Sequence, residues 1–203
     1  MIELAALVQE CAPQVAVPTM VALAQVESAH NPYAIGVVGG QVRQPQSLEE
    51  AVRAAETLEG QGKNFSLGIV QVNRHNLAKY GLDYRTAFEP CRNLAAGAAI
   101  LAECYGRAKG RYDNTQAALR AALSCYYSGN FLRGFSPDKP GAPSYVDKVV
   151  AAAGAQAPGV PSLLDPPRPT GARVSRAHDG GPVVLGGARA AGEGAPANPK
   201  VVF

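Results

Sequence analysis

The sequence has few charges, no long apolar run and no recognisable export signal, and each absence limits what the chain can do. Charged residues make up 17% of its 203 residues, and the net charge of +3 is too small to predict a nucleic-acid partner. No run of 18 apolar residues occurs, so we expect no membrane span. The first residues, Met1 to Leu4, lack the basic and apolar segments of a secretory signal. The hydrophobic share of 47% instead favours a globular domain with a core.

The composition changes after residue 153. From Gly154 to Phe203, Gly and Pro supply 17 of the 50 residues, and no aromatic residue occurs before Phe203. Average sequence contains roughly 12% Gly and Pro, and no helical or strand period is sustained here. We therefore expect one domain over residues 1–153 and a flexible Pro/Gly/Ala-rich tail over residues 154–203.

The predicted domain is mainly α-helical. Apolar residues recur at helical spacing between capping residues and helix breakers, whereas no pair of alternating strands flanks a hairpin turn. Ser47, Asn93, the 113–115 segment and Ser144 are candidate residues for helix starts. The predicted helices span about residues 2–10, 18–27, 48–58, 94–106, 115–126 and 144–153.

The four cysteines contain no Cys-x-x-Cys pair, so a zinc ribbon is not expected. An even number permits two disulfides in an oxidising compartment, and four reduced buried thiols fit equally well. If neighbouring helices run antiparallel, Cys91 at the start of one lies near Cys125 at the end of the next. That arrangement predicts the pairs Cys91–Cys125 and Cys11–Cys104, out of three possible pairings.

Glu27 is the residue most suggestive of chemistry. It shares a helical stripe with Met20, Leu23 and Ala24, which predicts that its carboxyl points inward. It also falls in the last turn of its helix, where the negative end of the helix dipole disfavours a carboxylate. Desolvation and the dipole both raise the pKa of a carboxyl group, as a general acid near neutral pH requires. The alternative is an exposed glutamate at a frayed helix end.

Two further segments carry residues suited to sugar binding. Gly68 begins a compact segment in which Gln71 and Asn73 place two amides two residues apart, and amides bind sugar hydroxyl and N-acetyl groups. Tyr126 and Tyr127 end a later helix, where rings suit sugar faces and a hydroxyl can hold a carboxyl group. The alternatives are an ordinary loop with a buried glutamine, and tyrosines that pack in the core.

Together these segments resemble the lytic transglycosylase family, the goose-lysozyme-like enzymes of bacterial cell walls, over about residues 5–150. The family's Glu-Ser at a helix end matches Glu27-Ser28, and its Gly-Leu-Met-Gln matches the segment from Gly68 to Gln71. Its Ala-Tyr-Asn-Ala-Gly matches residues 125–129, but Tyr127 replaces the family's Asn and leaves the positioning of substrate open. The resemblance implies a lysozyme-like helical domain with a groove, in which Glu27 is catalytic and the matched residues bind substrate.

The order of the remaining segments points to one subgroup of this family. Residues 31–40 are followed by an insertion that carries the helix at 48–58, and then by residues 64–68 and 90–94. This resembles the specialised transglycosylases encoded with type IV secretion systems, which open the wall so that the apparatus can assemble. The resemblance implies a periplasmic protein, expected as a monomer, whose tail contacts other components of the machine.

The mechanism that the resemblance implies uses one carboxyl group. Protonated Glu27 protonates the glycosidic oxygen between N-acetylmuramic acid and N-acetylglucosamine, and the substrate's N-acetyl group stabilises the cation. Glu27 then removes the proton of the C6 hydroxyl, which closes on C1 as a 1,6-anhydro sugar. Ser28 and Tyr126 are the expected supports of Glu27, and no metal or cofactor is expected. Asp83 and Glu89 are second carboxylates only in principle, since both fall in predicted loops.

Three other functions remain open from the sequence. A true lysozyme would add water and leave reducing ends. An inactive adapter would bind the wall and only recruit secretion proteins. A chitinase-like enzyme would act on other N-acetyl sugars.

Overall fold

The computed structural model describes residues 2–155, so the predicted tail lies outside the described residues except for its first two positions. Within that range the chain is mainly helical, as the sequence predicts, with one small sheet. The α-helices are α1 (Ile2–Cys11), α2 (Val17–Ser28), α3 (Leu48–Gly60), α4 (Pro90–Lys109), α5 (Thr115–Ser128) and α6 (Tyr145–Gly154). The strands are β1 (Ile35–Val37), β2 (Phe65–Leu67) and β3 (Val72–Asn73). Short 3-10 helices are η1 (Arg74–Asn76), η2 (Ala78–Tyr80), η3 (Thr86–Phe88) and η4 (Arg133–Phe135).

Side-chain caps fix the starts of three helices where the sequence predicts them. The side chains of Ser47, Asn114 and Ser144 accept a hydrogen bond from a backbone N–H in the first turn of α3, α5 and α6. The predicted cap at Asn93 is wrong. Helix α4 begins earlier, at Pro90, whose fixed φ suits a first turn, and Asn93 is therefore a buried residue inside the helix.

The sheet was not predicted because its strands are too short to show an alternating pattern. It has the order β1-β2-β3, and both pairings are antiparallel. Gly36 lies opposite Ser66, and Ser66 lies opposite Asn73, so residues from three separate segments meet in one row. Every residue of the three strands is buried, which makes the sheet part of the core rather than a surface ribbon.

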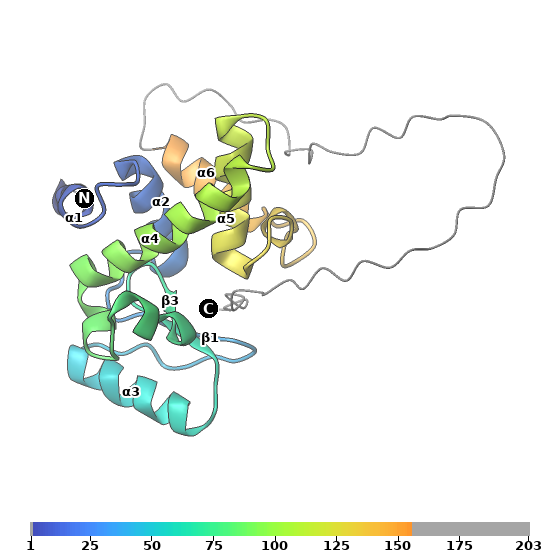
Figure 1. Cartoon of the computed structure of the whole chain (residues 1–203). Coiled ribbons are helices and arrows are strands. Elements are labelled where there is room, and N and C mark those ends of the chain that lie inside the picture. Colours follow the sequence, from blue (N-terminus) through green and yellow to red (C-terminus); the bar gives the residue numbers. More distant parts are fainter. Residues whose placement is uncertain (1, 156–203) are drawn as a thin grey trace, which may run out of the picture.

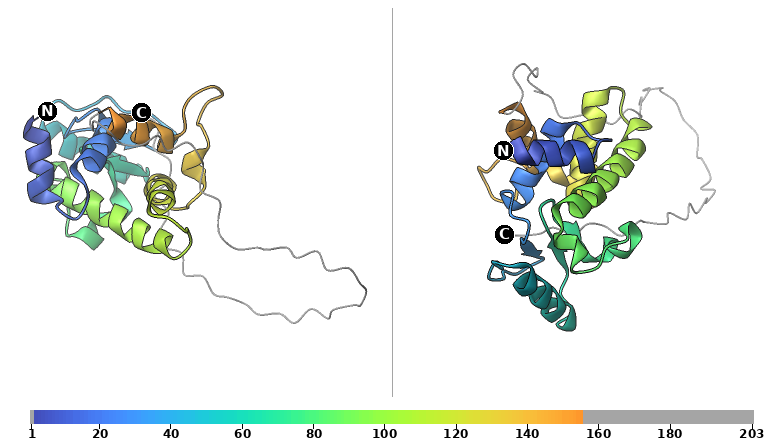
Figure 2. Two further views of the ribbon diagram at one scale, coloured as in Figure 1. Left: turned by 90° about the horizontal axis from the view of Figure 1, so that it is seen from above. Right: turned by 90° about the vertical axis from the view of Figure 1, so that its left-hand side faces the viewer.

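The helices and the sheet occupy two regions of the fold, with α4 reaching both. Helix α4 packs against α1 and α5, and α2 packs against α6. Figure 1 shows α5 and α6 in the upper region, and α3 with the sheet in the lower region. The right-hand view of Figure 2 shows α3, in teal, at the opposite end of the molecule from α5, in yellow-green, and α6 packs beside α2. The end of α2 consequently lies where the two regions meet. No helix within residues 2–155 combines the length and apolarity that a bilayer span requires.

The structure contains two disulfides, and their pairing differs from the predicted one. Cys11 is bonded to Cys91, with 5.2 Å between their Cα atoms, and Cys104 is bonded to Cys125, with 5.8 Å. The prediction assumed that α4 and α5 match end to end. Helix α4 has 20 residues and α5 only 14, so the end of α5 meets the middle of α4. Cys91 is roughly 20 Å along the helix from Cys104, at the end that α1 covers.

This pairing can be tested directly on the oxidised protein. We expect proteolysis without reductant to yield one peptide pair that contains Cys11 and Cys91, and another that contains Cys104 and Cys125. Mass spectrometry before and after reduction identifies each pair. Recovery of a Cys91–Cys125 peptide from folded protein would contradict the packing of α1 on the start of α4.

Candidate functional site

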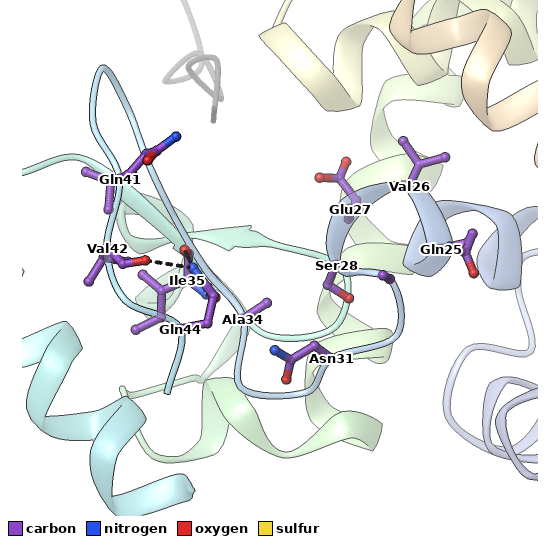
Figure 3. A pocket seen from close by; sticks show the side chains of 12 residues that line it. Gln25, Val26, Glu27, Ser28, Asn31, Ala34, Ile35, Gln41, Val42 and Gln44 are labelled. Atoms are coloured by element: carbon purple, nitrogen blue, oxygen red, sulfur yellow. Dashed lines mark hydrogen bonds between the residues drawn. The ribbon is translucent and has the colours of Figure 1, made fainter. Parts of the chain in front are cut away.

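Glu27 lies in the last turn of α2 and lines a groove of about 500 Å³. Its side chain is 8% exposed, so the predicted inward direction is confirmed and the exposed alternative is wrong. Figure 3 shows the carboxyl group directed from the end of α2 toward the side where Gln41 and Val42 form the other wall. The residues that line the groove are Gln25, Val26, Glu27, Ser28, Ala29, Asn31, Ala34, Ile35, Val37, Gln41, Val42 and Gln44.

Burial makes Glu27 a weaker acid than an exposed glutamate. Desolvation raises the pKa of its carboxyl group from 4.5 to about 7, and a hydrogen bond from Tyr145 lowers the pKa to a smaller extent. The backbone conformation adds to this environment: Ala29 adopts a left-handed conformation, with a φ of 52°, and ends α2 two residues later. Glu27 therefore lies at the negative end of the helix dipole, which also disfavours its charged form. A carboxyl group of this kind is able both to donate and to accept a proton near neutral pH.

Tyr145 is the main partner of Glu27, and the sequence analysis missed it. Its hydroxyl donates a hydrogen bond to Oε1 of Glu27, and both side chains are buried. The carbonyl oxygen of a neutral carboxyl group is its stronger acceptor, so this bond to Oε1 favours the proton on Oε2. Tyr145 is the first residue of α6, directly after the cap Ser144, and α6 packs against α2. The helix itself was predicted, but nothing local indicated that its first tyrosine would meet a glutamate 118 residues away.

Ser28 and Tyr126, the expected supports of Glu27, instead hold the segment that follows β2. The hydroxyl of Ser28 donates to the carbonyl oxygen of Ile69 at 2.7 Å, and that of Tyr126 donates to the carbonyl oxygen of Val70 at 2.5 Å. Ser28 also lines the groove, whereas Tyr126 is 1% exposed and is not among the residues that line it. The two side chains thus fix the position of the 69–70 backbone relative to α2 and α5.

The segment from Gly68 to Gln71 is a tight turn between β2 and β3. Gly68 has a φ of +80°, and its N–H donates to the carbonyl oxygen of Ala34 at 2.9 Å. The side-chain amide of Gln71 donates to the carbonyl oxygens of Ala34 and Gly68 at 3.0 and 2.7 Å. The Oε1 atom of Gln71 is buried without a hydrogen-bond partner. The predicted sugar-binding amide is thus turned toward the protein and links this turn to the segment before β1.

Asn93 supports the same turn from α4. Its side-chain oxygen accepts a hydrogen bond from the N–H of Val70, and its side-chain nitrogen donates to the carbonyl oxygens of Leu67 and Ala87. A buried asparagine with three satisfied hydrogen bonds fixes a loop more firmly than an apolar side chain does. The sequence offered one misleading signal here, because Asn93 also suits a helix cap.

The other predicted binding residues, Asn73 and Tyr127, have partners within the protein. The side-chain nitrogen of Asn73 donates to Asn64 at 2.9 Å and to Ser66 at 3.3 Å, and its oxygen caps η1. Tyr127 is half-buried at the end of α5, and its ring stacks on that of Tyr145. Glu27 and Ser28 are therefore the two predicted site residues that line the groove.

Gln44 holds the loop that forms the far wall of the groove, a role that the sequence analysis missed. Its side chain accepts from the N–H of Ile35 at 3.0 Å and donates to the Ile35 carbonyl oxygen at 2.9 Å. It thereby satisfies the outer edge of β1 as a neighbouring strand would. A further bond to the carbonyl oxygen of Val42, dashed in Figure 3, fixes the position of the loop opposite Glu27.

Glu27 is the single acidic residue among those that line the groove. The two carboxylates considered from the sequence have other partners: Asp83 accepts hydrogen bonds from Thr86, and Glu89 is paired with Arg92. Within residues 2–155, no three His, Cys, Asp or Glu side chains gather in a way that suits a metal ion. The chemistry that the described groove supports is therefore proton transfer by one carboxyl group.

Comparison with known proteins gives a consistent result. Residues 5–134 match the family described as Transglycosylase SLT domain. The chain is 60% identical to "Type IV secretion system protein virB1" of Brucella abortus over 155 residues, which cover 75% of this chain and 65% of that protein. It is 35% identical to "Protein virB1" of Rhizobium radiobacter over 161 residues, 79% of this chain and 63% of that protein. The chain thus spans slightly less than two thirds of the length of these relatives. No solved structure matches it.

Proposed function

Because the chain belongs to the family of proteins with a transglycosylase SLT domain, we propose that it is a lytic transglycosylase of bacterial peptidoglycan. The bond that it cleaves is the β-1,4 linkage between N-acetylmuramic acid and N-acetylglucosamine. The observation that carries this proposal is the buried carboxyl group of Glu27, which lines a groove with no other acidic residue among its lining side chains. Glycosidases that add water ordinarily use two carboxyl groups, whereas a single group suffices when the substrate supplies the nucleophile.

Glu27 performs two proton transfers in the proposed reaction. In its neutral form it gives the proton of Oε2 to the glycosidic oxygen, the C1–O bond breaks, and the substrate's N-acetyl group stabilises the cation. The carboxylate then takes the proton of the C6 hydroxyl, whose oxygen bonds to C1 and forms the 1,6-anhydro ring. The hydroxyl of Tyr145 donates to Oε1 throughout, so it stabilises the carboxylate formed between the two steps. Glu27 is neutral again at the end, and no water is consumed.

The relatives support a proposal for the setting of this reaction. We propose that the enzyme acts in the periplasm and opens the wall locally for assembly of a type IV secretion system, the system named in the printed name of the Brucella protein. Peptidoglycan glycan strands are its proposed partner, and the protein acts as a monomer. Contacts with other secretion components are proposed for the tail, which lies outside the described residues. A test is restoration of secretion in a bacterium lacking its own virB1 protein by the wild-type chain but not by Glu27→Gln.

Activity is expected to fall as the pH rises through about 7. The first step requires neutral Glu27, and the pKa of this group in the free protein is about 7. The rate of wall solubilisation at low wall concentration reports ionisation of the free enzyme. Measured across pH, this rate should show the decline on the alkaline side. A rate that keeps rising well above pH 7 would contradict the assignment of Glu27 as the acid.

The same pKa predicts how stability changes with pH. The folded chain holds the Glu27 proton more tightly than the unfolded chain, so the free energy of unfolding declines between pH 4.5 and about 7 and levels off above that. The decline amounts to about 3 kcal/mol. Glu27→Gln removes this contribution, so the variant should be more stable than the wild type above pH 7 and similar to it below pH 4.5. Denaturant titrations across this pH range measure the free energy of unfolding of both proteins. If the two free energies changed with pH in parallel, Glu27 would not be a buried neutral carboxyl group in the folded chain.

A further inference from the structure

Tyr127 falls at the Asn of the family motif that residues 125–129 resemble, and its ring lies against the residue that holds the proposed acid. The rings of Tyr127 and Tyr145 are stacked, with 4.4 Å between their centroids and 15° between their planes. Tyr127 lies in the last turn of α5, and Tyr145 begins α6. Since the hydroxyl of Tyr145 donates to Glu27, the ring of Tyr127 is one contact away from the carboxyl group.

The other end of Tyr127 is fixed by an ion pair. Its hydroxyl donates to the carboxylate of Asp138, whose two oxygens lie 3.0 and 2.9 Å away. Nη2 of Arg133 also donates to this carboxylate, at 2.7 Å, and Nη1 of Arg133 donates to the carbonyl oxygen of Ser136 at 3.0 Å. These bonds join η4, the connection that follows it and the end of α5. Free rotation and displacement of the Tyr127 ring are both restricted.

We propose that Tyr127, Asp138 and Arg133 form a clamp that keeps the ring of Tyr145, and through it the carboxyl group of Glu27, in the orientation that proton transfer requires. This inference rests on the proposed function and adds a role to Tyr127, which differs from the Asn of the motif that the segment resembles. Tyr127 is in this view a positioning residue. One face of its ring lies against Tyr145 and its hydroxyl donates to Asp138, which gives Tyr127 a role other than the sugar contact that the sequence analysis expected.

The orientation matters because one hydrogen bond distinguishes the two oxygens of Glu27. While Tyr145 donates to Oε1, the proton of the neutral carboxyl stays on Oε2, and the carboxylate formed by proton donation keeps a stabilising donor. A Tyr145 ring that tilts loses the alignment of its hydroxyl with Oε1, since hydrogen bonds weaken steeply with angle. A stacked aromatic neighbour opposes such tilting, and an asparagine at residue 127 has no ring face to do so.

The tyrosine hydroxyls around Glu27 are neutral and can therefore donate hydrogen bonds. The charge of Glu27 affects the pKa values of three tyrosines, which are Tyr126 and Tyr127 of α5 and Tyr145 of α6. Burial raises the pKa of all three phenols, and the negative charge of Glu27 raises it further, so they stay protonated. Beyond them, Asp138 raises the pKa of Tyr127 and Arg133 lowers it, which places the ion pair at the outer end of the clamp.

The test compares three substitutions in the full 203-residue chain. Tyr127→Leu removes ring and hydroxyl, Tyr127→Phe keeps the stacked ring, and Asp138→Ala removes the carboxylate. We expect Tyr127→Leu to lower kcat for wall solubilisation by ~10–100-fold with little change in KM, because misplacement of a reacting group is costly. The other two should show smaller losses. Lys139→Ala, an exposed change in the same connection, should match the wild type.

A second measurement follows Glu27 without any substrate. The hydrogen bond from Tyr145 lowers the pKa of Glu27, so a loosened ring should raise that pKa in Tyr127→Leu and, less, in Tyr127→Phe. Carbon NMR of the labelled Glu27 carboxyl reports this shift directly. An unchanged pKa and kcat with a raised KM would overturn the clamp, because that result marks a sugar-binding ring. If the wild type fails to cleave the wall, the proposed function fails, while the NMR shift still decides whether the clamp holds Glu27.

Discussion

Glu27→Gln is expected to lower peptidoglycan cleavage by ~10²–10⁴-fold, the usual contribution of a general acid or base. The amide is close to the carboxyl group in size, and its oxygen still accepts the hydrogen bond from Tyr145, so the fold and the groove should persist. What the amide lacks is a transferable proton and a basic oxygen. Release of soluble fragments from purified wall measures the effect.

The matched control is Glu56→Gln on α3. Glu56 is exposed and does not line the groove, so its neutral isostere should cleave the wall at the wild-type rate. Circular dichroism and thermal unfolding of both variants show whether the fold is kept. A Glu27→Gln protein with wild-type activity would remove Glu27 from the mechanism.

Gly68→Ala should be the most damaging small change to the structure itself. A methyl group at Gly68 would lie 2.5 Å from the carbonyl oxygen of Ala87 and 2.6 Å from Cγ of Asn93, and the φ of +80° disfavours any side chain. Asn93 would be displaced from its bonds to Val70, Leu67 and Ala87. Steric overlap, backbone strain and buried unpaired groups together cost on the order of 4 kcal/mol or more. Denaturant unfolding measures this loss.

Gly81→Ala separates backbone strain from steric overlap. Gly81 has a similar φ of +66°, but nothing lies within 4 Å of a methyl group there. Its alanine variant should lose only about 1 kcal/mol, the cost of a left-handed backbone conformation. Equal losses at the two glycines would show that the Gly68 turn is not tightly held by Asn93.

The sequence predicted the features of this fold that depend on local patterns. Helix caps at Ser47 and Asn114 are recognisable because a capping side chain bonds to N–H groups only a few residues away. The inward direction of Glu27 was predictable because the helical stripe that it shares with Met20 and Leu23 is buried. The motif match extended this to function, since three separated motifs in order are far more specific than any one.

The features that sequence analysis missed depend on contacts between distant segments. Tyr145 reaches Glu27 only because α6 packs on α2, and no local pattern reports that packing. The amide of Gln71 was expected to face a sugar, but its turn lies close enough to Ala34 to use the amide internally. The disulfide pairing depended on the relative lengths of α4 and α5, which a rule about antiparallel neighbours ignores.

The nature of the bond-breaking step is tested most directly by the chemistry of the new glycan ends. Purified peptidoglycan would be digested by the wild-type chain in water labelled with a heavy oxygen isotope, and the released fragments weighed by mass spectrometry. We predict ends that carry a 1,6-anhydro ring and no label, because Glu27 moves one proton out and one back while the sugar's own hydroxyl closes on C1. Reducing ends that contain the labelled oxygen would show that water is the nucleophile, and would contradict the account.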